Sequence, residues 1–349
     1  MCPASTHNTG SAAELTIDRV HLREWLISLG LRCAGPVEVA RIGGGNSNLT
    51  FLVTDTAARR WVLRRPPLGE LLASAHDVVR EARVMGALFD TDVSVPLILG
   101  VGAQDGVPMV LLEHVEGQVI EDMSVARKLT PHQRRATALA SVRALAQVHA
   151  VDLTATGLTD LAGHRPYAER QIRRWSRQWE QSRTRDLPLV DQLTDRLTAA
   201  IPEQRERTLV HGDFHLRNMI IAPGDGSITA VLDWELCTLG DPLADLGSLL
   251  AYWTEPGEPG VAGFEMTTLP GFPSRQELVD EYLDHTGRDP AALAFWHALG
   301  LWKLAIIAEG VRRRALDNPD NSTHAGAPTT EQIDHLVELA DVVATATGI

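Results

Sequence analysis

Lysine is nearly absent from the sequence: among 349 residues, only Lys128 and Lys303 are lysines. Any catalytic cation N-terminal to residue 128 must therefore be an arginine or a histidine. Positive charge as a whole is also scarce, because 32 basic residues face 45 acidic ones and the formal net charge is −13. Phosphate backbones select basic surfaces, so this charge argues against nucleic acid as the main partner.

Cysteine and long apolar runs are scarce as well. The three cysteines, Cys2, Cys33 and Cys237, are far apart and form no CxxC pair, so we expect neither a disulfide framework nor a thiolate metal site. The small number of widely spaced cysteines predicts a reducing compartment such as the cytoplasm. No uninterrupted run of about 18 apolar residues occurs, so we expect no membrane-spanning helix. Residues 1–14 are small and polar, without the basic and apolar regions of a signal peptide, and predict a disordered tail.

The periodicity divides the rest of the chain into a β-rich part and a helical part. Before residue 114, apolar alternation around polar and glycine-rich turns predicts strands, and apolar residues at helical spacing predict two helices. The expected helices are 15–30 and 74–89, the second with Ser74 as N-cap and a stripe of Val78, Ala82, Met85 and Phe89; the expected strands lie within 37–63, 95–102 and 108–117. Residues 15–113 therefore form one predicted lobe.

Residues 114–349 are expected to form a larger, helical lobe. Thr130 and Pro131 begin one helix by N-terminal capping, and Tyr167–Ser182 forms a second. The capping-box pair Ser274 and Glu277 begins a third, after a Gly/Pro-rich loop that has neither a strand nor a helix pattern. Two short strands joined by a turn, MII and ITAVLDW, are embedded among these helices. We therefore predict a two-lobed α+β fold.

Three side chains alternate in LVHGDFHLRN, where His211, Asp213 and His215 are two residues apart. On an extended strand they would share one face, and two imidazoles with a carboxylate suit the iron or zinc site of an oxygenase or hydrolase. The same stretch contains H-x-D-x-x-x-x-N, the catalytic-loop pattern of kinases, in which Asp213 accepts a proton and Asn218 holds Mg²⁺. The motif alone leaves both interpretations open.

The polar residues further along favour phosphoryl transfer. Asp213, Asn218 and Asp233 occur in that order, with the predicted hairpin between the last two. An amide oxygen and a carboxylate suit a hard cation, while another carboxylate can accept the proton of a substrate hydroxyl. Glu235, two residues after Asp233, is a candidate to assist at the same face.

A phosphate cradle is predicted in RIGGGNSNLTFLV. Gly44 and Gly45 allow backbone N–H groups to approach phosphate closely, and Asn46, Ser47 and Asn48 add side-chain donors. Glycine and asparagine also make ordinary hairpin turns, so the segment indicates nucleotide binding only together with the motifs downstream.

A cation for the phosphates is expected on the next strand, in WVLRRPP. Val62 and Arg64 alternate onto one face, so Arg64 would reach phosphate while Val62 covers a base, and Arg65 points the other way. Glu81, on the following helix, is the candidate ion-pair partner of Arg64. Solvated surface positions are the alternative for both charged residues.

Together these motifs resemble the aminoglycoside phosphotransferase (choline kinase-like) family of small-molecule kinases, in particular the kinase-like domain linked to some acyl-CoA dehydrogenases. The resemblance covers about residues 38–316 and is carried by RIGGGNSNLTF, WVLRRPP, REARVMGAL, LLEHVEG, LAQVHAVDL, LVHGDFHLRNMI, AVLDWELCTLGDPLADLG and GVRRRAL. It implies a protein kinase-like fold with a small β-rich N-lobe and a larger helical C-lobe. It also implies transfer of phosphate from ATP, or GTP in its place, with Mg²⁺. The acceptor would be the hydroxyl of an aminoglycoside-like compound, an amino alcohol or a hydroxyacyl compound.

The resemblance assigns a role to each residue of the C-terminal motifs. Asp213 matches the catalytic base, and Asn218 and Asp233 match the Mg²⁺ ligands. Asp241 and Asp245, in GDPLADLG, match a structural element beneath the active site.

In the N-terminal motifs, Arg64 stands where most members have lysine, and Glu81 matches its ion-pair partner. Asn46 replaces the glutamine expected in this branch. An arginine fork still binds phosphate bidentately, although it does not supply a compact point charge as lysine does. The hinge whose backbone meets adenine is matched by Glu113, His114 and Val115.

The acceptor pocket of the family lies among the C-terminal helices, so Trp296, His297 and Glu309 are candidates to line it. The apolar run FWHALGLWKLAIIAEGV also suits a core helix. The arginine-rich segment 165–185 is expected to be a solvated helix with its tryptophans packed inward, and a patch for a phosphorylated or CoA-bearing substrate is the alternative. For the whole chain, the alternative function is a catalytically silent nucleotide-binding module that regulates a partner.

Overall fold

The computed structural model describes residues 17–43, 48–67, 77–162, 165–258, 261, 263–317 and 327–349. The chain divides into two compact units. The first comprises the described residues up to Gly86 together with Pro96–Val115, and the second comprises Ala87–Val95 and Glu116–Ile349. The predicted tail 1–14, the N-cap Ser74 and the cradle residues Gly44 to Ser47 lie outside the described residues.

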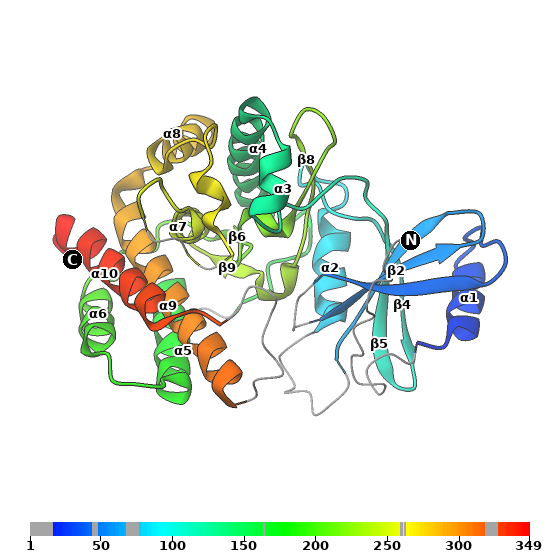
Figure 1. Ribbon diagram of the computed structural model, residues 1–349, viewed down its shortest axis with the longest axis horizontal. Helices are drawn as coiled ribbons and strands as arrows, with labels where there is room; N and C mark the ends of the chain where they lie inside the picture. Colours follow the sequence, from blue (N-terminus) through cyan, green and yellow to red (C-terminus); the bar gives the residue numbers. More distant parts are fainter. Residues whose placement is uncertain are drawn as a thin grey trace, which may run out of the picture. The chain divides into compact units, whose positions relative to one another are not determined.

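The first unit is built on an antiparallel sheet of five strands in the order β1-β2-β3-β5-β4 (Figure 1). Its strands are β1 (Val37–Ile42), β2 (Leu49–Asp55), β3 (Arg60–Arg65), β4 (Ile98–Gln104) and β5 (Val107–Glu113). Its helices are α1 (Arg19–Ser28) and α2 (Val78–Leu88), of which the end, from Ala87, belongs to the second unit. The predicted strands are therefore confirmed, although β4 begins at Ile98 rather than Val95 and β5 ends at Glu113 rather than Gly117.

One face of this sheet is apolar and is covered by α1. In β2, Leu49, Phe51 and Val53 are buried while the residues between them are partly exposed, which is the alternation expected of a strand with one buried face. These side chains pack with Leu22 and Leu26 of α1. Side chains that point the other way, such as Arg64, are thereby left for the opposite face.

The boundaries of both helices in this unit differ from the predicted ones. Helix α1 begins at Arg19 rather than near residue 15, because the Asp18 carboxylate accepts the N–H groups of Val20 and His21 and caps the helix there. Helix α2 begins after Asp77, whose carboxylate accepts the N–H of Arg80 at 2.9 Å. It ends at Leu88, so Phe89 leaves the predicted apolar stripe and is 47% exposed.

The second unit is mainly helical and contains two small antiparallel sheets, β6 with β9 and β7 with β8 (Figure 1). Its strands are β6 (Thr208–Val210), β7 (Met219–Ile221), β8 (Ile228–Val231) and β9 (Thr238–Gly240). Its α-helices are α3 (Met123–Lys128), α4 (Pro131–His149), α5 (Tyr167–Ser182), α6 (Pro188–Ala199), α7 (Pro242–Tyr252), α8 (Arg275–Thr286), α9 (Leu293–Asp317) and α10 (Thr330–Ala346). Short 3₁₀ turns are η1 (Leu216–Asn218), η2 (Trp234–Leu236), η3 (Glu265–Thr268) and η4 (Pro290–Ala292).

Local capping chemistry explains why several of these helices were predictable. Thr130 and Gln133 form a reciprocal capping box before α4, with Pro131 at the first helical position. Ser274 and Glu277 do the same before α8. The bounds predicted for α5 are those of the structure. In the described residues of the Gly/Pro-rich loop, the one helical element is the short turn η3, so the expectation of a segment without a regular helix or strand is nearly correct.

Helix α9 is the central helix of the second unit and packs against α5, α7 and α10. The segment Pro290–Asp317 is long and apolar enough to cross a membrane by length and composition, with a mean hydropathy of 1.6 and 56% of its most apolar window buried. The segment is not one uninterrupted apolar run, because His297 and Lys303 lie within it, and the sequence therefore did not indicate it. Its packing is that of a core helix, which passes the same test.

Two glycines bring α7 and α9 close together. A Cβ on Gly247 would lie 2.4 Å from the carbonyl carbon of Trp296, and one on Gly300 would lie 2.8 Å from the carbonyl oxygen of Gly247. These neighbours are backbone atoms, which cannot move aside without shifting a helix. Helix α7 and helix α9 each carry residues of the candidate site, so this close approach helps to position them.

We expect Gly300→Ala to lower the free energy of unfolding by about 1–3 kcal/mol, because it overpacks the α7–α9 contact. Gly310→Ala, on the same helix, is the matched control. The nearest atoms to its new Cβ lie 3.8 Å away, so the better helix propensity of alanine should stabilise the protein slightly. Denaturant unfolding of the two variants measures both effects. Equal stability of the two variants would contradict the close-approach account.

Candidate active site

The H-x-D-x-x-x-x-N segment follows β6 and forms a turn that ends in η1, not an extended strand. Antiparallel pairing of β6 with β9 and of β7 with β8 folds the chain back on itself on both sides of this turn. The N–H of Leu232 donates to the carbonyl oxygen of Asn218 at 2.8 Å. Asp233 therefore directly follows the residue that is paired with Asn218, and the hairpin brings together two residues that are 15 positions apart in the sequence.

The Asp213 carboxylate is held at both of its oxygens. The hydroxyl of Tyr252, at the end of α7, donates to Oδ1 at 3.1 Å, and Nε2 of His215 lies 3.3 Å from Oδ2. Burial favours the neutral acid, but His215, Lys303 and His211 together hold the pKa of Asp213 below its usual range. Burial and the neighbouring Asp213 raise the pKa of Tyr252 well above its usual value, so the hydroxyl keeps its proton. The site thus presents an ionised, oriented carboxylate.

The Asn218 amide is oriented by the same turn. Its Nδ2 donates to the carbonyl oxygen of Asp213 at 2.9 Å, which leaves the amide oxygen as the atom able to bind a cation. Asp233 has a left-handed backbone conformation, φ 66° and ψ 61°, which is uncommon for a residue other than glycine and is enriched at functional sites. An amide oxygen with one carboxylate fits Mg²⁺, which takes its other ligands from water and phosphates.

A protein-only metal centre is not supported. Among the described residues, no group of three or more His, Cys, Asp and Glu side chains is placed to hold a metal ion. Nε2 of His211 donates to the carbonyl oxygen of Leu232 at 2.9 Å, and its Nδ1 accepts the N–H of Asp213 at 3.3 Å. His215 instead contacts the Asp213 carboxylate. The two imidazoles therefore have separate partners, and the iron or zinc interpretation has no geometric basis in this part of the chain.

A buried carboxylate supports the turn from below. Asp245 of α7 accepts the N–H of His211 at 2.6 Å and the N–H of Gly212 at 2.9 Å. Nε2 of His149 lies 3.3 Å from the same carboxylate. Burial opposes ionisation of Asp245, but His149, His211 and the N–H of Gly212 keep its pKa below the usual range. Asp241 caps α7 by accepting the N–H of Leu243. Both aspartates thus have structural contacts of the kind expected.

In the first unit, the expected ion pair between Arg64 and Glu81 is confirmed, with Nη1 of Arg64 3.0 Å from Oε1 of Glu81. Glu81 is almost fully buried, so it fixes the guanidinium rather than lying on the surface as the alternative required. Val62 is partly exposed on the same face of β3, and Arg65 is buried on the other side of the strand. Asn48, the one cradle residue within the described part, is also buried.

The predicted hinge begins at the end of β5. The N–H of Glu113 donates to the carbonyl oxygen of Leu97 at 3.0 Å, and its Oε1 accepts the N–H of Leu97 at 2.8 Å. The backbone and the side chain of Glu113 therefore both bind Leu97 and fix the end of β5. His114 and Val115 follow it and are partly exposed. Binding of adenine by this backbone stays a prediction.

The predicted acceptor residues have different surroundings. Trp296 is buried beside Tyr167 and lines a small pocket that also includes Gly212, the residue before Asp213. Burial lowers the pKa of His297 to about 3, so its imidazole is neutral. Glu309 is fully buried and accepts the N–H and hydroxyl of Thr184, both at 2.6 Å, which suits a structural contact. Glu235 is partly exposed in η2. Their roles towards an acceptor stay predictions.

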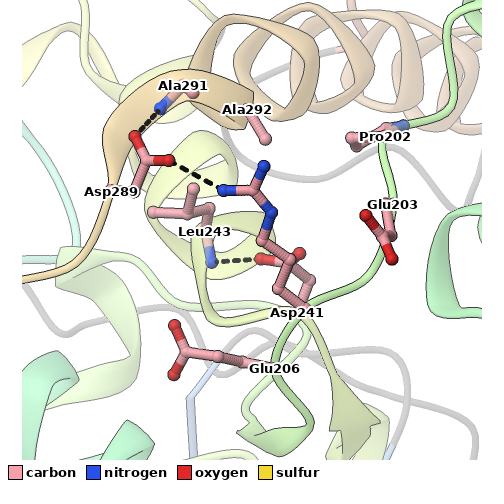
Figure 2. A pocket seen from close by; sticks show the side chains of 9 residues that line it. Pro202, Glu203, Glu206, Asp241, Leu243, Asp289, Ala291 and Ala292 are labelled. Carbon is pink, nitrogen blue, oxygen red and sulfur yellow. Dashed lines mark hydrogen bonds and ion pairs between the residues drawn. The ribbon is translucent and has the colours of Figure 1, made fainter.

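A larger pocket of about 210 Å³ is formed elsewhere in the second unit (Figure 2). Its wall includes Asp241 and Asp289, whose carboxylates accept the N–H groups of Leu243 and Ala291, as Figure 2 shows. Arg205 reaches Asp289 at 2.9 Å. Among the described residues, none of those predicted to bind nucleotide, metal or acceptor or to act as the base lines this pocket, so its size alone gives it no role in the chemistry described above.

Sequence reasoning missed the aromatic residues around Asp213. Tyr252 lies at the end of α7 and Phe264 lies in the Gly/Pro-rich loop, and both rings pack against His215 at centroid distances of 4.6 and 5.0 Å. The guanidinium of Arg217 lies 5.1 Å from the centre of the Phe264 ring. No local pattern marks these positions, because their contacts with the turn depend on the packing of α7 and the loop.

Burial of three histidines predicts that the fold weakens in acid. The pKa values of His149, His211 and His297 are lowered because burial disfavours the imidazolium. A histidine whose pKa falls on folding stabilises the fold fully above its unfolded pKa of about 6.5, and this contribution is lost as the pH drops. We expect the free energy of unfolding to fall below about pH 6.5, by up to about 1.4 kcal/mol per pH unit for each histidine.

Urea unfolding between pH 7 and pH 5 measures this slope. His297→Gln should make it shallower, while His285→Gln, at an exposed position of α8, should leave it unchanged. A flat profile in the wild type would contradict the prediction.

Comparison with known proteins adds a family to this geometry. A family model described as the phosphotransferase enzyme family matches residues 38–296. Acyl-CoA dehydrogenase family member 10 of Mus musculus is 36% identical over 328 residues, which cover 92% of this chain and 30% of that protein. Family member 11 of Rattus norvegicus is 33% identical over 326 residues, which cover 91% of this chain and 42% of that protein. The chain thus spans less than half the length of these curated relatives.

Solved structures agree on the fold. A crystal structure of a Ralstonia eutropha protein assigned to the aminoglycoside phosphotransferases is 31% identical, with a TM-score of 0.76, and covers 93% of this chain and 98% of its own. Amicoumacin kinase hAmiN, solved with AMP-PNP, Ca²⁺ and Ami, is 15% identical with a TM-score of 0.59, and covers 95% of this chain and 94% of its own. At that identity the likeness concerns the fold alone. The predicted kinase-like α+β fold, with an N-terminal sheet and a helical C-terminal region, is confirmed.

Proposed function

Because the chain belongs to the phosphotransferase enzyme family, we propose that it transfers the γ-phosphate of ATP to a hydroxyl group of a small molecule. The observation that carries the proposal is the Asp213 carboxylate, which is held by Tyr252 and His215 and kept ionised beside the Asn218 amide. Phosphoryl transfer depends mainly on positioning of the reacting groups and on charge stabilisation. A carboxylate held in this way can position the acceptor hydroxyl.

In the proposed reaction, Asp213 accepts a hydrogen bond from the acceptor hydroxyl and aims its oxygen at the γ-phosphorus. A new P–O bond forms as the bond to the β-phosphate oxygen breaks, ADP leaves, and the hydroxyl proton passes to Asp213. A lowered pKa makes Asp213 a weak base, which suits a loose transition state in which the proton moves late.

Asn218 and Asp233 are the proposed ligands of Mg²⁺, through the amide oxygen and the carboxylate. When bound, the cation neutralises charge on the β- and γ-phosphate oxygens. The Asp213 carbonyl holds the amide nitrogen of Asn218, so the residue that orients the hydroxyl also orients a metal ligand.

For the nucleotide, we propose that Arg64 binds the phosphates while Glu81 holds its guanidinium in place. Val62 would contact the base, and the backbone of Glu113, His114 and Val115 would meet adenine. The cradle Gly44 to Asn48 would supply N–H and side-chain donors to the phosphates. These assignments rest on the family resemblance together with the fixed geometry of the ion pair.

We expect Arg64→Ala to raise the dissociation constant of Mg²⁺-ATP by about 10- to 100-fold, because it removes charge-assisted hydrogen bonds worth about 1.5–3 kcal/mol. Arg60→Ala, at the exposed start of the same strand, is the matched control and should bind as the wild type does. Calorimetric titration measures both affinities. Equal affinities for the two variants would exclude Arg64 as a phosphate ligand.

Among acceptors, we propose a hydroxyacyl compound, such as a CoA thioester, ahead of an aminoglycoside or an amino alcohol. The names of the curated relatives, which are acyl-CoA dehydrogenase family members, support this order. A screen that reports ADP release over hydroxyacyl-CoAs, amino alcohols, aminoglycosides and sugars, with ATP and with GTP, tests it. Nucleotide binding without turnover on any acceptor would instead favour the silent regulatory module.

A further inference from the structure

Lys303 reaches the catalytic turn from the middle of α9. Its Nζ donates to the carbonyl oxygen of Gly212, the residue before Asp213, at 2.8 Å. The ammonium also lies 5.5 Å from the centre of the Trp175 ring, a cation–π distance that offsets part of the cost of burying it. The sequence motifs gave this lysine no role.

The peptide group between Gly212 and Asp213 is held on both sides. Lys303 binds its carbonyl oxygen at 2.8 Å, and Nδ1 of His211 accepts its N–H at 3.3 Å. The preceding N–H, that of Gly212, is bound by Asp245 at 2.9 Å. Rotation of this peptide group would turn the backbone of Asp213 and carry its carboxylate away from Tyr252.

Gly212 has no side chain that could oppose such a rotation. Its φ of +84° is accessible mainly to glycine, and a Cβ there would lie 2.7 Å from the carbonyl oxygen of Leu236. The turn therefore needs a glycine at the position before the catalytic residue. A glycine gives the backbone freedom that outside contacts must remove, and Lys303 supplies one of them.

The charges around Lys303 also suit this role. Burial lowers the pKa of the ammonium, while Asp213 of the turn and Asp245 of α7 act to raise it and Arg174 of α5 acts to lower it. The cation in turn favours the ionised form of Asp213. A neutral side chain of similar length would fill the space but would provide neither the hydrogen bond nor the charge.

We propose that Lys303 is a positioning residue, which fixes the Gly212–Asp213 peptide group and so holds the Asp213 carboxylate in its catalytic orientation. The inference rests on the proposed function, because it gives Asp213 the task of orienting the acceptor. Helix α9 thereby acts on the chemistry through the backbone of the turn, without contacting the reacting atoms.

The scarcity of lysine allows a test on the wild-type protein that needs no substrate. With [¹³C,¹⁵N]lysine, only Lys128 and Lys303 give side-chain signals, and Lys128→Met assigns them. We expect a slowly exchanging ammonium with a lower titration midpoint for Lys303, and fast exchange for the exposed Lys128. Fast exchange and an equal midpoint for both lysines would overturn the proposal.

The Lys303→Met variant then tests whether loss of this contact loosens the turn and slows phosphoryl transfer. We expect faster amide exchange at Gly212 and Asp213, and a kcat about 100-fold lower with unchanged KM for ATP and acceptor, as expected for a small misplacement of a catalytic group. Lys303→Arg should recover part of kcat, because a guanidinium can donate to the same carbonyl, and Lys128→Met should behave as the wild type does. Unchanged amide exchange and unchanged kcat in Lys303→Met would overturn the proposal.

The two proposals fail in different ways. If the wild type phosphorylates no acceptor, the proposed function fails, while the ammonium and amide-exchange measurements still decide the role of Lys303. If Lys303→Met does not fold, the ammonium measurement on the wild type decides it.

Discussion

Replacement of Asp213 by asparagine is expected to lower kcat for phosphoryl transfer by about 10²- to 10⁴-fold, the usual contribution of a positioned acid or base. Asparagine has nearly the same shape and can still accept a hydrogen bond from Tyr252, so the fold should persist. It cannot take the proton of the acceptor hydroxyl, and it removes the negative charge that faces His215 and Lys303. Steady-state ADP release with the acceptor found in the screen measures the loss.

Asp225→Asn is the matched control for this variant. Asp225 lies at the exposed turn of the β7–β8 hairpin, where its carboxylate accepts the N–H of Ser227. This control should keep the wild-type kcat. Turnover by Asp213→Asn at the wild-type rate would remove Asp213 from the mechanism, and loss of Mg²⁺-ATP binding in that variant would assign it to the nucleotide rather than to the acceptor.

Replacement of Asp245 by asparagine is expected to lower the free energy of unfolding by about 3 kcal/mol, the scale of hydrogen bonds to a charged group. The carboxylate accepts the N–H groups of His211 and Gly212, in the turn that carries Asp213, at a fully buried position. An amide has only one oxygen and would turn an NH₂ group towards the second donor. We therefore expect kcat to fall as well, because the turn that carries Asp213 loses a fixed contact.

Asp152→Asn is the control for this second variant. The Asp152 carboxylate also accepts two backbone N–H groups, of Thr154 and Ala155, but both at Oδ1 and in an exposed turn, so an amide oxygen can replace it. Its effect should be under about 1 kcal/mol, the usual net value of an exposed hydrogen bond. Denaturant unfolding of both variants makes the comparison. Equal losses of unfolding free energy in the two variants would show that neither the burial of Asp245 nor the use of both its oxygens adds to its stabilising effect.

Asp245 also contributes to the acid sensitivity of the fold. Its folded pKa is lowered, so its stabilising contribution is present above the unfolded value of about 4 and is lost as the pH falls through the folded value. In Asp245→Asn this part of the acid transition should disappear. The losses from the buried histidines begin nearer pH 6.5 and should remain.

The sequence was most informative where the chemistry is local. The spacing of Asp213 and Asn218 is five residues, and the short hairpin that follows brings Asp233 next to Asn218, so a linear motif is enough to find all three. Capping boxes were equally readable, because a Thr130 or Ser274 side chain meets backbone only three residues away. Arg64 and Glu81 were found because strand alternation and helix spacing each fix a face.

Contacts between residues far apart in the chain could not be predicted from the sequence. The pairing of β6 with β9 joins segments about 30 residues apart, and neither strand is long enough to show alternation. Tyr252 and Lys303 reach the turn from α7 and α9, where their neighbours predict only a buried helix. Glu309 was a candidate for the acceptor pocket because that pocket lies among the C-terminal helices of the family. Its carboxylate accepts the N–H and the hydroxyl of Thr184 in the interior, a contact that the sequence did not indicate, and its role towards an acceptor stays a prediction.

The alternation of His211, Asp213 and His215 was the most conspicuous pattern and the least informative one. It suggests one face of a strand only if the segment is extended, and Gly212, with φ of +84°, turns the chain instead. The two imidazoles then make different contacts. Nε2 of His211 donates to the backbone carbonyl oxygen of Leu232, and His215 contacts the Asp213 carboxylate.

The most direct test of the central claim is ³¹P NMR of a reaction with Mg²⁺-ATP and the acceptor that gives the fastest ADP release. We predict a phosphate monoester signal that grows in step with ADP in the wild type and is absent over the same time with Asp213→Asn. ADP accompanied only by inorganic phosphate, or the same monoester formed at the wild-type rate by Asp213→Asn, would contradict the account.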